Sequence, residues 1–136
     1  MAIAENKALV RRLYDAIERE DWDDVAQLFH RDFVFYHQVD TPILGAQGFI
    51  ESEKKNFDAI PGFKISVIDL VAEENKVAAY LIIEGKQTKE LMGIPARGAK
   101  VRFSLLNLLT IVDGKIIEKR AHFDVHDIIR QLKSEG

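Results

Sequence analysis

The sequence predicts an α+β domain in which helices pack on one face of a curved antiparallel sheet. Helical periodicity dominates the N-terminal part of the chain, and runs rich in Val, Ile and Leu dominate the C-terminal part. Two strand-like runs flank Asp113-Gly114, a dipeptide suited to a two-residue hairpin turn. Helices first and hairpins afterwards are typical of an α+β fold, because an α/β fold alternates the two along the chain.

The composition fits a single domain spanning residues 1–136, without a linker, a repeat or a low-complexity segment. A net charge of −3 argues against nucleic acid as the main partner. The absence of cysteine excludes disulfides and thiolate chemistry. No apolar run is long enough to cross a membrane, and the N-terminus has no signal-peptide core, so we expect a cytoplasmic protein.

Three helices and a strand are expected before the hairpins. The spacing of apolar residues predicts helices over Glu5–Arg19 and Gln47–Ile60, and Asp21 is expected to cap a short helix between them. Tyr14 borders the apolar face of the first helix. The stripe on the third helix consists of Phe49, Ile50, Glu53, Phe57 and Ile60. Alternation over 32–38 predicts a strand with Phe33, Phe35 and His37 on one side.

The remaining chain is expected to form two hairpins and a terminal helix. Strands are predicted over Phe63–Ala72 and Val77–Gln87, with Ile68, Leu70 and Ala72 facing Leu81, Ala79 and Val77. Residues 92–98 form a loop before the second hairpin. After Asp124, the apolar spacing of Val125, Ile128, Ile129 and Leu132 predicts a helical turn or two.

A tight turn at Asp113-Gly114 fixes a register for the second hairpin, with Val112 opposite Lys115. The pairs that follow are Leu109 with Glu118, Asn107 with Arg120, Leu105 with His122 and Phe103 with Asp124. The first strand is apolar on this face, so the register points Glu118, Arg120, His122 and Asp124 into the core. Buried ionisable groups are costly unless paired or solvated, so we expect a wet pocket there.

The opposite face of this hairpin is too apolar to be freely solvated. We expect it to carry Leu106, Leu108, Ile117, Ala121 and Phe123, ringed by Arg102, Thr110, Lys115 and Lys119. Such a patch usually marks a protein–protein contact, which predicts a homodimer.

Five stretches of the sequence resemble the SnoaL-like polyketide cyclases, a branch of the superfamily that also holds ketosteroid isomerase and nuclear transport factor two. They are GAQGF at 45–49, IDLVAEENKVAAYLIIEG at 68–85, ELMGIPARGAKVRF at 90–103, IVDGKIIEKRAHFD at 111–124, and IIRQL near the C-terminus. The resemblance covers nearly the whole chain. It implies a cone of curved sheet and N-terminal helices around an apolar pocket, often dimeric.

The resemblance also implies chemistry. Cyclases of this family need no cofactor and close a ring by an aldol step, with an acidic side chain late in the last strand, where this chain has Asp124. The chain departs from the family at Arg120, where an aromatic residue is common, and at Asn107, where an acidic one is common. In the loop, Ala96 and Arg97 replace Pro and Thr. These changes alter the pocket rather than the frame.

The candidate site combines a carboxylate with hydrogen-bond donors. Forming an enolate needs a base and donors to the developing oxyanion. We expect Asp124 and His122 to be catalytic. The residues expected to bind a ligand are Arg120, Asn107, His37, Tyr14 and Phe103. Structural alternatives remain: Asp124 caps the terminal helix or pairs with an arginine, Arg120 pairs with Glu118, and Tyr14 belongs to the core.

Three functions remain open. The first is a cofactor-free enzyme that closes a ring or transfers a proton in an apolar carbonyl compound. The second is a module that binds a small apolar ligand without chemistry, and the third is a dimeric scaffold with a vestigial pocket. His37, His122 and Asp124 match a two-histidine, one-carboxylate metal triad, but their spacing is unspecific and we expect no metal.

Overall fold

The computed structural model describes residues 2–134, which fold as four helices and one six-stranded sheet. The helices are α1 (Ile3–Glu18), α2 (Trp22–Leu28), α3 (Gly45–Asp58) and α4 (Val125–Lys133). The strands are β1 (Phe29–Tyr36), β2 (Pro42–Leu44), β3 (Lys64–Glu73), β4 (Lys76–Lys86), β5 (Lys100–Val112) and β6 (Lys115–His122). The predicted α+β class and element order are confirmed, with the short β2 added in the expected loop.

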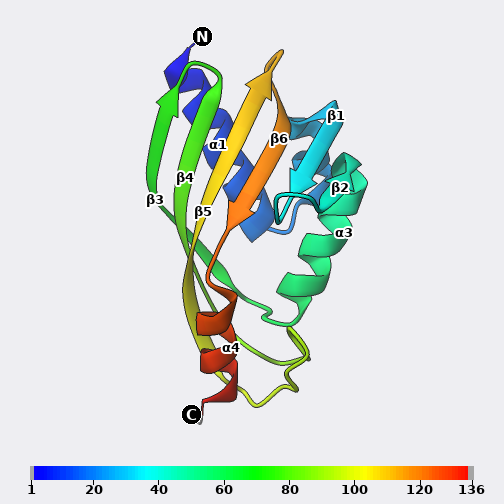
Figure 1. Cartoon of the computed structure of the whole chain (residues 1–136), viewed down its shortest axis with the longest axis vertical. Coiled ribbons are helices and arrows are strands. Elements are labelled where there is room, and N and C mark those ends of the chain that lie inside the picture. The colour runs from blue at the N-terminus through cyan, green and yellow to red at the C-terminus, as the bar shows by residue number, and fades with distance from the viewer. Residues whose placement is uncertain (1, 135–136) are drawn as a thin grey trace.

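The sheet is curved, open and mixed. Its strand order is β2-β1-β6-β5-β4-β3, and Figure 1 shows the long strands β3, β4 and β5 side by side. Neighbouring strands are antiparallel except β1, which pairs with β6 in parallel. The prediction of a wholly antiparallel sheet was therefore wrong at one pair.

The helices bury their apolar stripes against the concave face of the sheet. Helix α1 packs against β3 and β4, and α3 packs against β1 (Figure 1). Val10, Leu13 and Ile17 of α1 and Phe49 of α3 are fully or almost fully buried. Helix α4 packs against β5, at the opposite end of the long axis from the β5–β6 turn (Figure 1). The space between these elements holds the core and the cavity described below.

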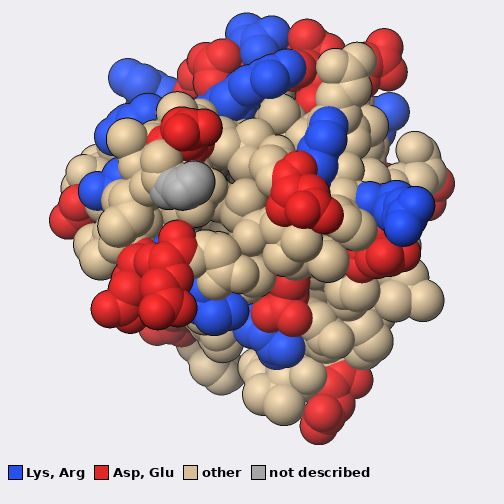
Figure 2. All heavy atoms as spheres, turned by 90° about the horizontal axis from the view of Figure 1, so that it is seen from above, with Lys and Arg blue, Asp and Glu red and all other residues tan. Residues whose placement is uncertain are grey.

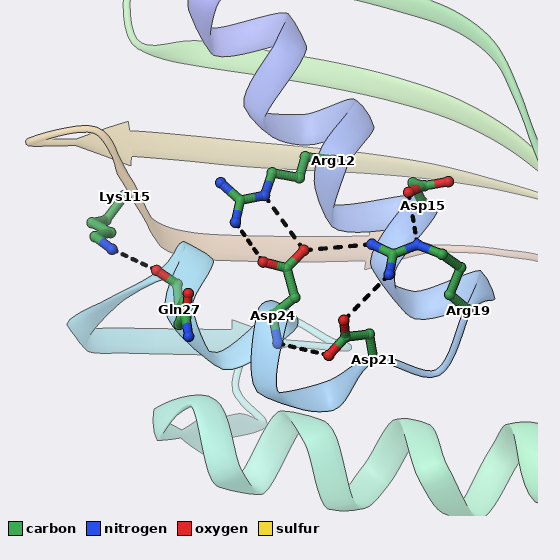
Figure 3. Close-up of polar contacts among 7 residues, drawn as sticks. All are labelled: Arg12, Asp15, Arg19, Asp21, Asp24, Gln27 and Lys115. Carbon is green, nitrogen blue, oxygen red and sulfur yellow. Dashed lines mark hydrogen bonds and ion pairs between the residues drawn. The ribbon is translucent and has the colours of Figure 1, made fainter.

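Polar contacts connect α1 to α2. Asp21 caps α2, as predicted, by accepting a hydrogen bond from the backbone N–H of Asp24 at 3.1 Å. Asp24 in turn forms ion pairs with Arg12 of α1 and with Arg19, the residue that follows this helix (Figure 3). The Arg12 guanidinium holds the pKa of the Asp24 carboxyl below its ordinary value. These contacts are exposed, so the buried stripe of α1 carries most of the stabilisation.

The predicted register of the β5–β6 hairpin was wrong beyond its first two pairs. Asp113 and Gly114 form the turn, with φ values of 53° and 72°, and Ile111 pairs with Ile116 as expected. The next pair is Thr110 with Glu118, so Ile117 is an extra residue in a β-bulge. Every later side chain of β6 therefore points to the face opposite to the predicted one.

The bulge has a physical reason. It moves Glu118, Arg120 and His122 out of the core and brings Lys119 and Ala121 in. Burying three ionisable groups without partners costs more than burying one. A second bulge, at Ile68 in β3, turns Ile68 outward and places Val67 opposite Leu81, whereas Leu70 and Ala72 pair as predicted.

The convex face of the sheet exposes a line of apolar side chains across three strands. Leu106 and Leu108 of β5 lie there as predicted, with Tyr80 of β4 and Val71 of β3 nearby in register, and Leu106 is 52% exposed. Ala121 and Lys119, predicted for this face, are instead buried on the concave side. The homodimer predicted from this face stays a prediction.

Charged side chains of both signs are interspersed at the end of the molecule that Figure 2 shows, with uncharged surface between them. Within residues 2–134, no helix is long and apolar enough to cross a membrane.

Candidate functional site

A cavity of about 260 Å³ lies between α1, α3, α4 and the concave face of the sheet. Apolar side chains from all of these elements form most of its wall, among them Ile17, Phe57, Leu81, Phe103, Ala121 and Ile128. Five polar or ionisable side chains that matter for chemistry also reach it: Tyr14, His37, Glu53, Asn107 and Lys119. An apolar cavity with a few convergent polar groups is the usual form of a small-molecule site.

Tyr14 and Asn107 form a buried hydrogen-bonded pair on the wall of the cavity. The Asn107 side-chain amide donates to the Tyr14 hydroxyl oxygen at 2.7 Å, and Asn107 is 1% exposed. Desolvation by burial raises the pKa of the Tyr14 phenol, so it remains protonated and can donate its own proton. The Asn107 Oδ1 atom has no hydrogen-bond partner among residues 2–134. The pair thus offers polar groups that the protein itself does not saturate.

Lys119 of β6 and Glu53 of α3 bring ionisable groups to the same cavity. Lys119 comes from β6, is 2% exposed, and its Nζ atom lies 4.8 Å from the ring centroid of Phe35. Burial lowers the pKa of the Lys119 amine and raises that of the half-buried Glu53 carboxyl. Each charge opposes the shift of the other, but the structure shows no direct ion pair between them in the described chain.

The structure brings together four of the residues predicted to bind a ligand. Tyr14, Asn107, His37 and Phe103 all line the cavity, although they come from three separate segments of the chain. His37 is exposed at its edge and its ring centroid lies 5.8 Å from that of Phe35. Their roles in binding stay predictions.

Arg120 lies outside this cavity, contrary to its predicted position. Its guanidinium pairs with Glu118 at 2.9 Å and stacks on the ring of Tyr36, 4.0 Å from the centroid. The structural alternative, an ion pair of Arg120 with Glu118, is therefore confirmed. The bulge at Ile117 is the cause, because it turns both residues to the convex face.

His122 and Asp124 also lie outside the core, where they were predicted. His122 is exposed on the convex face, opposite Leu106. Asp124 is exposed and caps α4, accepting from the backbone N–H of Asp127 at 3.1 Å, which was the structural alternative for it. Its chain neighbour Phe123 does line the cavity. The expected core position of these two residues was wrong, whereas their catalytic role stays a prediction.

Two ionisable side chains of the cavity, Glu53 and Lys119, were not among the predicted site residues. A signal for Glu53 was present, because it stands on the otherwise apolar stripe of the third helix. The signal for Lys119 was weaker. The adjacent Ile116 and Ile117 break the alternation of β6, as a residue inserted by a bulge does, and this shifts Lys119 inward.

A buried glutamine holds the loop that closes one side of the cavity. The Gln87 side-chain amide donates to the carbonyl oxygens of Lys89 and Ile94 at 3.0 and 2.8 Å. Leu91 and Met92, which lie between those residues, line the cavity. The substituted positions Ala96 and Arg97 belong to the same segment, and neither lines the cavity.

Metal ligation has no cluster to support it in the described chain. No group of three or more His, Asp or Glu side chains gathers there in a way that could hold a metal ion. In particular, His37 lines the cavity while His122 lies on the other face of the sheet.

Fold and cavity together define an α+β cone that encloses an apolar site. The model of the SnoaL-like polyketide cyclase family matches residues 7–132 of this sequence. The chain belongs to the SnoaL-like polyketide cyclase family, as the resemblance of its motifs implies.

Individual relatives agree with this assignment. The aklanonic acid methyl ester cyclase DnrD of Streptomyces peucetius is 29% identical over 131 residues, covering 91% of this chain and 88% of the relative. The corresponding cyclase AcmA of Streptomyces galilaeus is 27% identical over 134 residues, covering 96% and 92%. Among solved structures, the SnoaL-like protein of Jannaschia sp. CCS1 has a TM-score of 0.91 at 22% identity, covering 100% of this chain and 97% of that one.

Proteins with a similar fold also include an enzyme of another class. An LEH-like epoxide hydrolase of M. tuberculosis has a TM-score of 0.75 at 20% identity, covering 96% of this chain and 90% of that one. At such identities the likeness concerns the fold, so the reaction must be argued from the site.

Proposed function

We propose that this protein binds an apolar carbonyl compound in its cavity and, without a cofactor, closes a ring by an aldol step or transfers a proton. The observation that carries the proposal is the Tyr14–Asn107 pair on the wall of an otherwise apolar cavity. The relatives DnrD and AcmA are described as cyclases of aklanonic acid methyl ester, which points to a polyketide-type ester or ketone as the substrate class.

The size and lining of the cavity support a small apolar ligand. Its volume of about 260 Å³ lies near the lower end of ligand pockets, which hold roughly 300–1,000 Å³. Burying the apolar surface of such a ligand supplies binding free energy at about 25 cal/mol per Å². The few polar groups then orient the ligand rather than hold it.

Tyr14 is suited to stabilise the charge that an aldol step creates. Removing a proton next to a carbonyl group leaves negative charge on the carbonyl oxygen, and a positioned donor lowers the energy of that state. The Tyr14 phenol keeps its proton and uses its oxygen to accept from Asn107, so its O–H is free to donate to a ligand.

Two carboxyl groups are candidates for the proton transfer. Asp124 holds the position at which the family uses an acidic residue, but it caps α4 at the surface, next to the cavity residue Phe123. Glu53 lies in the cavity itself. Loss of the group that moves the proton is expected to lower the rate by about 10²–10⁴-fold. Comparing Asp124→Asn with Glu53→Gln therefore assigns the role.

Binding without chemistry is the second candidate function. The observation that favours it is that Asp124 and His122, the two residues expected to be catalytic, both lie outside the cavity. Under this reading ligand binding persists in every variant that leaves the cavity open, and no product forms.

The test blocks the cavity and leaves the fold intact. Ala121→Phe fills the cavity from β6, and Ala8→Phe makes the same change on the exposed side of α1. The probes are aklanonic acid methyl ester and smaller aryl ketones, with calorimetry for binding and chromatography for the ring-closed product. We expect Ala121→Phe to lose both binding and turnover, and Ala8→Phe to keep them. Binding without turnover in the parent protein supports the binding module, and equal behaviour of the two variants contradicts the cavity as the site.

A further inference from the structure

Lys119 is the one lysine or arginine with a buried side chain in the described chain. The bulge at Ile117 turns it toward the concave face, where it pairs across the sheet with Leu109 on one side and Phe35 on the other. Its Nζ atom lies 4.8 Å from the ring centroid of Phe35 and 5.0 Å from that of Phe49. The amine thus reaches an aromatic corner of the cavity rather than solvent.

This position is costly for a purely structural lysine. The Lys119 amine forms no hydrogen bond or ion pair with any residue in the described chain, and its charge is attracted only by the two rings and, without direct contact, by the Glu53 carboxyl. A methionine or leucine would fill the same space without a charge to desolvate. The bulge nevertheless points this side chain inward, so a chemical use for the amine accounts for its place.

Glu53 is a carboxyl group that lines the same cavity from α3 and acts on the Lys119 charge. Partial burial favours its protonated form, whereas burial favours the uncharged form of the Lys119 amine. An uncharged amine and a protonated carboxyl group are the two partners that capture of a carbonyl compound requires.

We propose that the Lys119 amine forms an imine with an aldehyde or ketone bound in the cavity, and that Glu53 supplies the proton that expels water. The inference rests on the proposed function, since it assumes that the cavity binds a carbonyl compound. It assigns a covalent step to a residue that the family resemblance does not single out.

The step balances without a further reactant. The amine nitrogen attacks the carbonyl carbon, the carbon–oxygen double bond becomes single, and a proton moves from nitrogen to oxygen. Glu53 then protonates the hydroxyl group, water leaves, and a carbon–nitrogen double bond forms. The Glu53 carboxylate takes a proton from the carbon next to the protonated imine, which gives an enamine. The enamine carbon attacks the second carbonyl group, and Glu53 returns the proton to the oxygen of that group. Water finally hydrolyses the imine and returns the free amine of Lys119.

The first test traps the imine in the full chain. Benzaldehyde is the probe, because it has no α-proton and stops at the imine, and cyanoborohydride reduces that imine to a stable benzyl amine. Intact mass and peptide mapping locate the label. We expect Lys119 to be labelled faster than exposed lysines such as Lys115, by about tenfold for each unit by which burial lowers its pKa.

Matched variants check the assignment. Lys119→Arg keeps the charge and loses the nucleophile, so it removes the fast label, whereas Lys115→Arg on the same strand leaves it. Glu53→Gln slows labelling of Lys119 by about 10²-fold or more, and the exposed Glu51→Gln on the same helix does not. Labelling spread evenly over exposed lysines, or fast labelling that persists in Lys119→Arg, overturns the inference.

Failure of the inference is distinguishable from failure of the proposed function. Binding of acetophenone is followed by the NMR shift of the Ala121 methyl group, which lines the cavity. If the ketone binds there but benzaldehyde never labels Lys119, the imine is refuted and the binding site stands. If the ketone does not shift Ala121, both are refuted.

Discussion

The buried hydrogen bond between Asn107 and Tyr14 gives the sharpest stability prediction. Tyr14→Phe removes the hydroxyl that accepts from the Asn107 amide at 2.7 Å. The amide then keeps no partner at either end, because its Oδ1 atom already lacks one in the described chain. Leaving a buried polar group unsatisfied costs about 1–3 kcal/mol.

This cost converts into a measurable shift in melting temperature. Unfolding entropies of about 2.1 cal/mol/K per residue give a chain of 136 residues roughly 0.3 kcal/mol per degree. Tyr14→Phe should therefore lower Tm by about 3–10 °C in scanning calorimetry. Tyr80→Phe is the matched control, since Tyr80 is 40% exposed and its change should stay within about 0.5 kcal/mol.

A double-mutant cycle isolates the pair. Asn107→Leu removes the amide and leaves a buried hydroxyl, and the combination with Tyr14→Phe removes both polar groups. The double variant should be destabilised less than the sum of the single ones, by about 0.5–3 kcal/mol. Additive effects, or a Tyr14→Phe variant as stable as the parent protein, would refute a dry, coupled pair at this wall of the cavity.

Three further predictions concern other parts of the molecule. Asp124→Ala should lower the free energy of unfolding by about 0.5–2 kcal/mol in denaturant titration, and Asp124→Asn should leave it nearly unchanged, because asparagine caps helices as well. A loss of about 3–5 kcal/mol in Asp124→Asn would instead indicate a buried ion pair. Because the pKa of Glu53 is raised in the folded state, its contribution to stability is fully present below the ordinary glutamate pKa and is lost as pH rises through the folded pKa. Glu53→Gln should therefore flatten the pH dependence of the free energy of unfolding over this interval. An unchanged pH profile would contradict burial of the Glu53 carboxyl. If the convex face pairs two copies, Leu106→Glu should change the sedimentation of the protein from that of a dimer to that of a monomer. Phe123→Glu should instead alter the cavity, which Phe123 lines. A monomeric parent protein would contradict the dimer proposal.

Local patterns predicted most of the fold. The helices α1 and α3 begin and end within two residues of their predicted ranges. Asp21 caps α2 and Asp113-Gly114 forms the turn between β5 and β6, as predicted, because capping and turn geometry depend on neighbouring residues alone. The parallel pairing of β1 with β6 was not predicted, since partners distant in sequence leave no local signal.

The site was predicted in part. Tyr14, His37, Phe103 and Asn107 were expected near a pocket and do line the cavity. Tyr14, Phe103 and Asn107 stand on helix or strand faces whose direction the element fixes, and His37 directly follows β1. The predicted directions of the β6 side chains were wrong for one reason. A single inserted residue, Ile117, reverses every later side chain of the strand, and alternation in the sequence does not reveal where the insertion falls.

The central claim is that an apolar carbonyl compound binds between Tyr14 and Lys119 in the cavity. A crystal structure of the protein soaked with an aryl ketone tests it most directly. We expect electron density for the ketone in this cavity, with its oxygen within hydrogen-bond distance of the Tyr14 hydroxyl. Ketone density on the convex face of the sheet, or a cavity that remains without ketone at saturating concentration, would contradict the account.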